Sequence, residues 1–130
     1  MTNKGGKKST TRATIAGVFS SSGKAASRCY NTGNISYKGA CTDYSLDKAI
    51  WVQGVGTGNG TSECYNTGKI TVKLTSGTAR VGGVSYVGTK LKNCYNTGEV
   101  SLTGNGQIGG IAAEFYDGYS NYNIGKISGK

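Results

Sequence analysis

Three cysteines recur at one position of a repeated pentapeptide. Cys29, Cys64 and Cys94 each begin the run Cys-Tyr-Asn-Thr-Gly. Thiolates are common ligands of structural zinc, and two thiols can form a disulfide. Residues at the same position of stacked repeats point the same way, which does not suit a tetrahedral metal site. We therefore expect no metal ion, and we favour a reduced, buried row of thiols over a bridge between neighbouring units.

Carboxylates offer a second chemistry. The chain has six acidic residues and no histidine, so glycoside hydrolysis by two carboxylates is the reaction to consider. Two pairs lie close in sequence, Asp43 with Asp47 and Glu114 with Asp117, but neither belongs to a recognisable catalytic motif. Without histidine the commonest general base is missing. We predict no catalytic residue and no cofactor, and we keep a polysaccharide lyase or hydrolase fragment as the lesser alternative.

The pentapeptide is one half of a unit that occurs four times. A degraded fourth copy occupies residues 121–125, and the four copies start 35, 30 and 27 residues apart. A second element, with an apolar residue on either side of a small or polar residue and a glycine, precedes each copy by 12 to 14 residues. It begins at Ile15, Val52, Val81 and Ile108. Such self-similarity is typical of repeat proteins.

Each unit predicts two short β-strands. Residues 69–74 alternate polar and apolar, which places Ile70, Val72 and Leu74 on one face of a strand. Glycine is frequent, with 23 residues in 130, and each interior glycine costs a helix about 1 kcal/mol. A two-stranded unit cannot bury its own apolar face, whereas stacked units can. We therefore expect an all-β chain in which residues 14–130 form a short parallel β-solenoid of about four coils.

Stacking would give each residue of the pentapeptide a role in a ladder. Cysteines would form a buried row, tyrosines would stack, and asparagines would hydrogen-bond along the stack. The glycines would take the left-handed conformation. Lys69, Glu99 and Lys126, which follow three of the glycines, alternate in charge and favour this register. The expected ladder positions are Cys29, Cys64, Cys94, Tyr30, Tyr65, Tyr95, Tyr122, Asn31, Asn66, Asn96, Asn123, Gly33, Gly68, Gly98 and Gly125.

The third unit carries a family resemblance. Its runs Gly-Gly-Val-Ser-Tyr-Val-Gly, at residues 82–88, and Asn-Cys-Tyr-Asn-Thr-Gly-Glu-Val-Ser, at residues 93–101, resemble the GLUG repeat of bacterial surface and adhesin-like proteins. The resemblance extends over about residues 14–129. It implies a β-solenoid stalk on a secreted or surface protein, including large peptidases in which such repeats are accessory segments. It transfers no catalytic residue.

Departures from the repeat are where we look for binding. The first unit has an insert between Tyr37 and Ile50, and the last has a loop of acids and aromatics at residues 114–119. Aromatic faces and carboxylates suit sugars, although each segment could instead be a structural loop or an end cap. The candidate ligand- or partner-binding residues are Tyr37, Tyr44, Asp47, Trp51, Glu114, Tyr116, Asp117 and Tyr119.

The charge balance and the ends of the stack suggest partners. The formal net charge is +9, which favours an anionic glycan, whereas nucleic-acid binding rests on charge alone. Residues 1–13 read as a basic arm that is flexible or clasps a neighbour, and no apolar run is long enough to span a membrane. Open sheet edges recruit further strands, so other domains of a larger surface protein or a second copy, stacked head to tail, are expected partners.

These observations favour a non-enzymatic, extracellular or cell-surface module with a structural or adhesive role. Stacking end to end would turn it into a filament. The alternative is a module that binds an anionic glycan.

Overall fold

The computed structural model describes residues 2–4, 13–18, 25–41, 49–56 and 59–130, and of residues 2–4 only the backbone. Every element in these ranges is a β-strand. The long strands belong to one sheet of parallel strands, β1-β4-β7-β11-β15, in which β2 pairs with β5 and β5 with β7. These strands are β1 (Thr2–Lys4), β2 (Thr14–Ala16), β4 (Ile35–Ala40), β5 (Ile50–Gln53), β7 (Ile70–Gly82), β11 (Val100–Gly109) and β15 (Ile127–Gly129).

Three smaller parallel sheets complete the fold. The pentapeptides supply the strands of one four-stranded sheet, in the order β14-β10-β6-β3. The other two sheets have two strands each, β12-β8 and β13-β9. The short strands are β3 (Tyr30–Asn31), β6 (Tyr65–Asn66), β8 (Ser85–Gly88), β9 (Leu91–Lys92), β10 (Tyr95–Asn96), β12 (Ala112–Phe115), β13 (Gly118–Tyr119) and β14 (Tyr122–Asn123).

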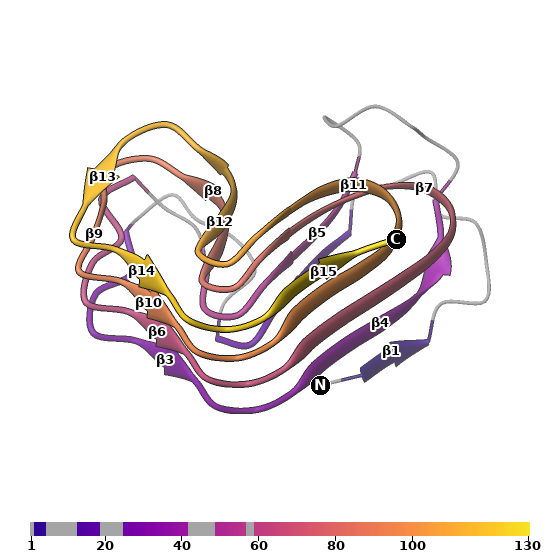
Figure 1. The fold of residues 1–130 in the computed structure, drawn as a ribbon, viewed down its shortest axis with the longest axis horizontal. Coiled ribbons are helices and arrows are strands. Elements are labelled where there is room, and N and C mark those ends of the chain that lie inside the picture. Colours follow the sequence, from indigo (N-terminus) through magenta and orange to yellow (C-terminus); the bar gives the residue numbers. More distant parts are fainter. Residues whose placement is uncertain (1, 5–12, 19–24, 42–48, 57–58) are drawn as a thin grey trace.

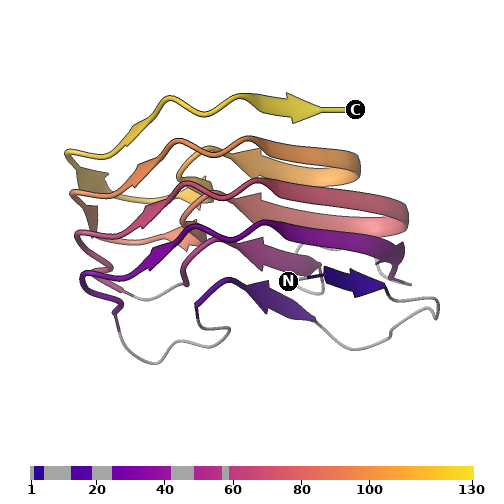
Figure 2. The same ribbon diagram turned by 90° about the horizontal axis from the view of Figure 1, so that it is seen from below.

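Successive units lie side by side in a constant register. Ile35 of β4 pairs with Ile70 of β7, Ile70 with Val100 of β11, and Val100 with Ile127 of β15. Figure 2 shows these units as layers, with the N-terminal strands at one end of the stack and the C-terminal strand at the other. The prediction of an all-β chain with parallel strands is therefore confirmed.

The expectation of two short strands per unit is wrong. The third unit carries β8, β9 and β10 between the end of β7 and the start of β11, because the short segments before the pentapeptide also pair with the next unit. The two strands that we expected around residues 69–74 and 81–84 are largely one strand, β7, which turns back on itself in Figure 1. Gly77, with φ 88°, lies at this bend. One half of β7 pairs with β4 and the other with β5.

The core runs along the stack as two apolar clusters. The larger is formed by β2, β4, β5, β7 and β11, and includes Ile35, Ile70, Val81 and Val100. The smaller contains Val55, Val84, Cys64 and Cys94. Each fully buried aliphatic side chain stabilises the fold by about 1.5–3 kcal/mol. Stacking therefore gives every unit a core that it could not form alone.

Three of the four pentapeptide glycines are required for close packing, and none has a left-handed backbone, which corrects our expectation. Gly33, Gly68, Gly98 and Gly125 have no positive φ. A Cβ at Gly68 would collide with the carbonyl oxygen of Gly33, and one at Gly98 with that of Gly68. The left-handed position lies instead just before each pentapeptide, where φ is between 53° and 55°. It is occupied by Arg28, Glu63, Asn93 and Ser120.

The start of the basic arm is a strand. β1 pairs with β4 of its own chain, with Thr2 opposite Ser36 and Lys4 opposite Lys38. The expectation of a flexible or clasping arm otherwise falls on residues 1 and 5–12, which lie outside the described ranges. In the part of the chain that the structure describes, no helix is long and apolar enough to cross a membrane.

Candidate interaction surfaces

A continuous asparagine ladder runs through all four pentapeptides. The side-chain Nδ2 of Asn31 donates to Oδ1 of Asn66, that of Asn66 to Asn96, and that of Asn96 to Asn123, each at 2.7 Å. Every amide also donates to the carbonyl of the glycine two residues on, as from Asn66 to Gly68 at 2.8 Å. These bonds satisfy buried amides that would otherwise be costly. The ladder has a direction, because each donor lies on the N-terminal side of its acceptor.

The tyrosines form a parallel aromatic stack. Ring centroids are 4.9 Å apart between Tyr30 and Tyr65, 4.8 Å between Tyr65 and Tyr95, and 5.2 Å between Tyr95 and Tyr122. Neighbouring planes differ by at most 6°. The two terminal rings, Tyr30 and Tyr122, are more than half exposed. Among the described residues, no further ring stacks on the outer face of Tyr30 or of Tyr122.

The cysteines line the smaller core cluster as free thiols. Sγ of Cys64 donates to the carbonyl of Ser62 at 3.1 Å, and Sγ of Cys94 to that of Lys92 at 3.3 Å. The hydrogen bond with Cys94 and burial raise the pKa of the Cys64 thiol. Among the described residues no group of three or more histidine, cysteine or acidic side chains could hold a metal ion.

The insert residues that the structure describes are part of the packing. Tyr37 is 5% exposed and belongs to the larger core cluster, so its ring offers no face to a ligand. The ring of Trp51 stacks on that of Tyr86 with centroids 4.1 Å apart. Cys41 is buried, and its Sγ accepts the N–H of Thr78 at 3.4 Å. The other two candidates, Tyr44 and Asp47, lie outside the described ranges.

Residues 114–119 lie on the surface, and two of their carboxylates are engaged. Glu114 pairs with Arg80 at 3.0 Å and accepts the phenol of Tyr116 at 2.8 Å, a hydrogen bond that raises the pKa of Tyr116. Oδ1 of Asp117 accepts the backbone N–H of Lys90 at 2.6 Å. Neither carboxylate is placed as a free acid–base group. Tyr116 and Tyr119 are about two-thirds exposed.

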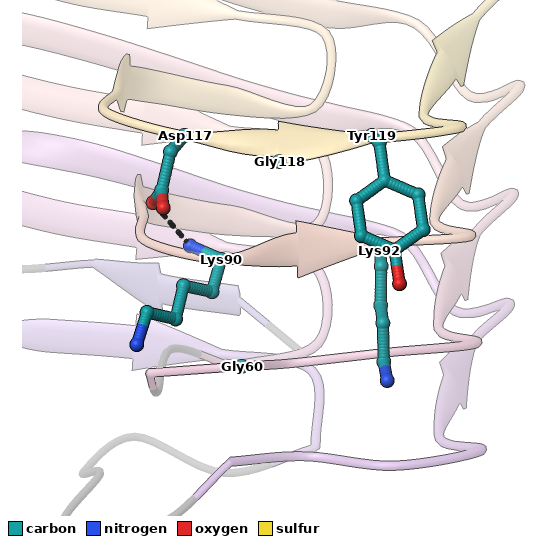
Figure 3. Close-up of a pocket in the computed structure, with 6 residues that line it drawn as sticks. All are labelled: Gly60, Lys90, Lys92, Asp117, Gly118 and Tyr119. Atoms are coloured by element: carbon teal, nitrogen blue, oxygen red, sulfur yellow. Dashed lines mark hydrogen bonds between the residues drawn. The ribbon is translucent and has the colours of Figure 1, made fainter.

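Asp117 and Tyr119 help to line an open groove of about 350 Å³. Figure 3 shows the side chains of Lys90 and Lys92 extending toward the turn that carries Gly60, with the ring of Tyr119 beside Lys92. Tyr119 and Lys92 are partners in the pairing of β13 with β9. Two ammonium groups next to an aromatic ring suit an anionic, ring-containing ligand.

Our sequence analysis missed the two lysines, although a signal was present. Lys90 and Lys92 precede Cys94 by four and two residues, and Asp117 and Tyr119 precede Asn121 by the same offsets. Equal offsets from a repeated motif place residues in adjacent positions of neighbouring units. Comparing offsets outside the pentapeptide would therefore have brought the lysines together with the aromatic loop.

The C-terminal edge of the stack leaves apolar side chains in contact with solvent. Ile127 is 44% exposed, whereas its register partner Val100 and the next, Ile70, are fully buried. Ile124 is 75% exposed. At the other edge, Ile35 is 1% exposed. The described edges therefore differ, and the C-terminal edge has the character of an incomplete core.

The expected charge alternation is partly present. Nζ of Lys69, just before β7, lies 3.0 Å from a carboxylate oxygen of Glu99, just before β11. A second exposed pair joins Arg28 to Glu63 at 3.7 Å. Such pairs contribute only a few tenths of a kcal/mol, but they favour the observed register over a slip.

Searches of protein-family models, of curated proteins and of solved structures find no match for this chain.

Proposed function

We propose that the chain is a short parallel β-solenoid of the GLUG type, with a non-enzymatic structural or adhesive role at the cell surface or outside the cell. The support is the continuity of its ladders. Asparagine amides, tyrosine rings and buried aliphatic residues each repeat from one unit to the next. A stack of this kind makes a rigid rod and leaves the outward-facing positions free to vary.

The exposed C-terminal edge carries the second half of the proposal, which is end-to-end stacking of copies. Ile127 occupies a position that a further layer would cover, because its counterparts Ile70 and Val100 are buried in the inner units. Nδ2 of Asn123 donates one hydrogen to Gly125 at 2.8 Å. In the interior units the other hydrogen goes to the next asparagine. In a second copy, the asparagine ladder begins at Asn31 and the tyrosine stack at Tyr30. Oδ1 of that Asn31 would accept the remaining hydrogen of Asn123, and the ring of Tyr30 would stack on Tyr122.

A second candidate function is binding of an anionic glycan in the groove of Lys90, Lys92 and Tyr119. The observation that favours it is the register pairing of an exposed lysine with an exposed tyrosine, which gives charge and a ring face side by side. A uronic acid residue combines the two complementary features, a carboxylate and a sugar ring.

Salt separates the two functions, because it acts on them in opposite directions. Copies with a net charge of +9 repel one another, and the screening length falls from about 10 Å at 0.1 M salt to about 3 Å at 1 M. We expect the rods seen by electron microscopy to lengthen with salt and with protein concentration. The sedimentation coefficient should rise over the same series. Binding of polygalacturonate, measured by calorimetry, should weaken over the same series.

A purely monomeric protein at high concentration and high salt would contradict stacking. If calorimetry detects no heat of polygalacturonate binding at low salt, the glycan site is contradicted. Replacing Lys92 by glutamine should reduce that binding, whereas Lys73→Gln, on an exposed position of β7 away from the groove, is the matched control.

A further inference from the structure

The hydrogen bonds of the long sheet show which way the backbone groups at its N-terminal edge point. The N–H of Ile35 donates to the carbonyl of Lys69 at 2.8 Å, so Ile35 faces β7. Successive residues of a strand face opposite neighbours, and Ser36 therefore faces β1. In a parallel pair, a residue bonds to the two neighbours of its opposite number. Since Thr2 lies opposite Ser36, the carbonyl of Ser36 accepts the N–H of Asn3.

The same reasoning assigns the free groups of β15. The N–H of Val100 donates to the carbonyl of Lys126 at 2.9 Å, and the N–H of Lys130 donates to Leu102 at 3.0 Å. Lys126 and Lys130 therefore face β11. Ile127 and Gly129 alternate with them and direct their N–H and C=O groups to the open edge.

Continuing the register by one unit brings these two edges together. Ile127 of one copy would lie opposite Ile35 of the next, as Val100 lies opposite Ile70 inside the molecule. The N–H of Gly129 would then reach the carbonyl of Ser36, which is the acceptor that Asn3 occupies. Both β1 and β15 pair parallel to their neighbours, so they compete for one edge.

We propose that β1 is an intramolecular cap on the acceptor edge, and that stacking exchanges it for β15 of a second copy. The proposal rests on the end-to-end stacking proposed above and adds that β1 controls when stacking occurs. β1 belongs to the same chain as β4, so its local concentration is high, of the order of millimolar for linked segments. Assembly is therefore suppressed at low protein concentration.

β1 and β15 have three residues each. The exchange is favourable at high concentration because a second copy brings further contacts together with β15. It adds the burial of Ile127, a fourth asparagine contact and one more stacked tyrosine pair to each junction. Such aromatic pairs and buried amide bonds each stabilise by about 1 kcal/mol. β1 pairs only with β4, over residues 36–38.

Proline at Asn3 tests the cap, and alanine at the same position is the control. Asn3→Pro removes the N–H that Ser36 accepts, whereas Asn3→Ala keeps it. We expect the concentration of half-maximal assembly, measured by sedimentation velocity, to fall about tenfold for Asn3→Pro and to stay within twofold for Asn3→Ala. Both variants should melt close to the wild type, because they alter a three-residue strand at the edge of the sheet.

Gly129 supplies the second arm. A Cβ at Gly129 would meet nothing within 4 Å, so alanine fits there. Only proline removes the N–H that faces the open edge. In the Asn3→Pro background, Gly129→Pro should abolish assembly and Gly129→Ala should preserve it.

The outcomes distinguish the two proposals. Equal assembly of Asn3→Pro and Asn3→Ala, with assembly blocked by Gly129→Pro, would overturn the cap and leave stacking intact. Equal assembly of Gly129→Pro and Gly129→Ala would overturn the shared acceptor on Ser36. Failure of every variant to assemble at any concentration or salt would overturn both proposals.

Discussion

The two edges of the stack carry the same residue type at equivalent positions and treat it differently. Ile35 begins β4 and Ile127 begins β15, and both occupy the column that Ile70 and Val100 fill inside the molecule. Ile35 is 1% exposed and Ile127 is 44% exposed. The position in the repeat therefore does not decide burial. What decides it is whether further chain covers the edge.

The difference extends to the hydrogen-bonding groups of the backbone. At the N-terminal edge, β1 occupies the groups of Ser36 that face outward. At the C-terminal edge, Ile127 and Gly129 face outward from β15, and in the described ranges no strand pairs with that side of β15. Exposed edges of this kind recruit strands from other chains, and natural proteins usually protect them. One edge here is protected and the other is not.

Replacing each isoleucine by alanine gives the largest expected contrast between the edges. Ile35→Ala should lower the free energy of unfolding by about 2–5 kcal/mol, because it leaves a cavity in the core. Ile127→Ala should lower it by less than about 1 kcal/mol in the monomer, since the side chain is half exposed already. Urea denaturation at low protein concentration measures both. Equal losses would mean that Ile127 is covered in solution, and the edges would not differ as described.

Much of this fold could be predicted from the sequence because the repeat transmits its own register. The asparagine and tyrosine ladders follow from four copies of one pentapeptide, and both are present with the expected partners. Alternation along residues 69–74 correctly placed Ile70, Val72 and Leu74 in the core. Only pairing between units had to be assumed.

The rest could not be predicted because it depends on contacts between units that no single unit encodes. Gly68, Gly98 and Gly125 avoid a collision with the carbonyl of the glycine in the preceding unit. Sequence alone cannot distinguish that requirement from a left-handed backbone. Tyr37 resembled a ligand contact because it opens an insert, yet its alternation with Ser36 in β4 points it into the core. The groove lysines were overlooked because they lie outside the most regular motif.

Alkaline pH should expose the protected edge selectively through Tyr37. Burial, and then the nearby Cys41, raise the pKa of this phenol above its usual value of about 10. The folded state therefore disfavours the phenolate, and the stabilisation is fully present below pH 10 and is lost as pH rises through the folded-state pKa. We expect wild-type stability to fall more steeply above pH 10 than that of Tyr37→Phe. If the free energy of unfolding falls equally with pH in the two proteins, ionisation of the buried phenol does not destabilise this edge.

The smallest expected effect comes from adding one charge to the N-terminal edge. Asn34 begins the column that continues through Lys69, Glu99 and Lys126, and its Oδ1 accepts the N–H of Lys69 at 2.9 Å. Asn34→Asp keeps that acceptor and would place a carboxylate opposite Lys126 of a stacked copy. An exposed cross-strand pair contributes a few tenths of a kcal/mol, so assembly should strengthen about twofold at low salt and return to the wild-type value at high salt. Asn34→Ser is the neutral control. A twofold gain that persists at high salt would have to come from the monomer fold, whereas a gain that salt removes identifies a contact between the two edges.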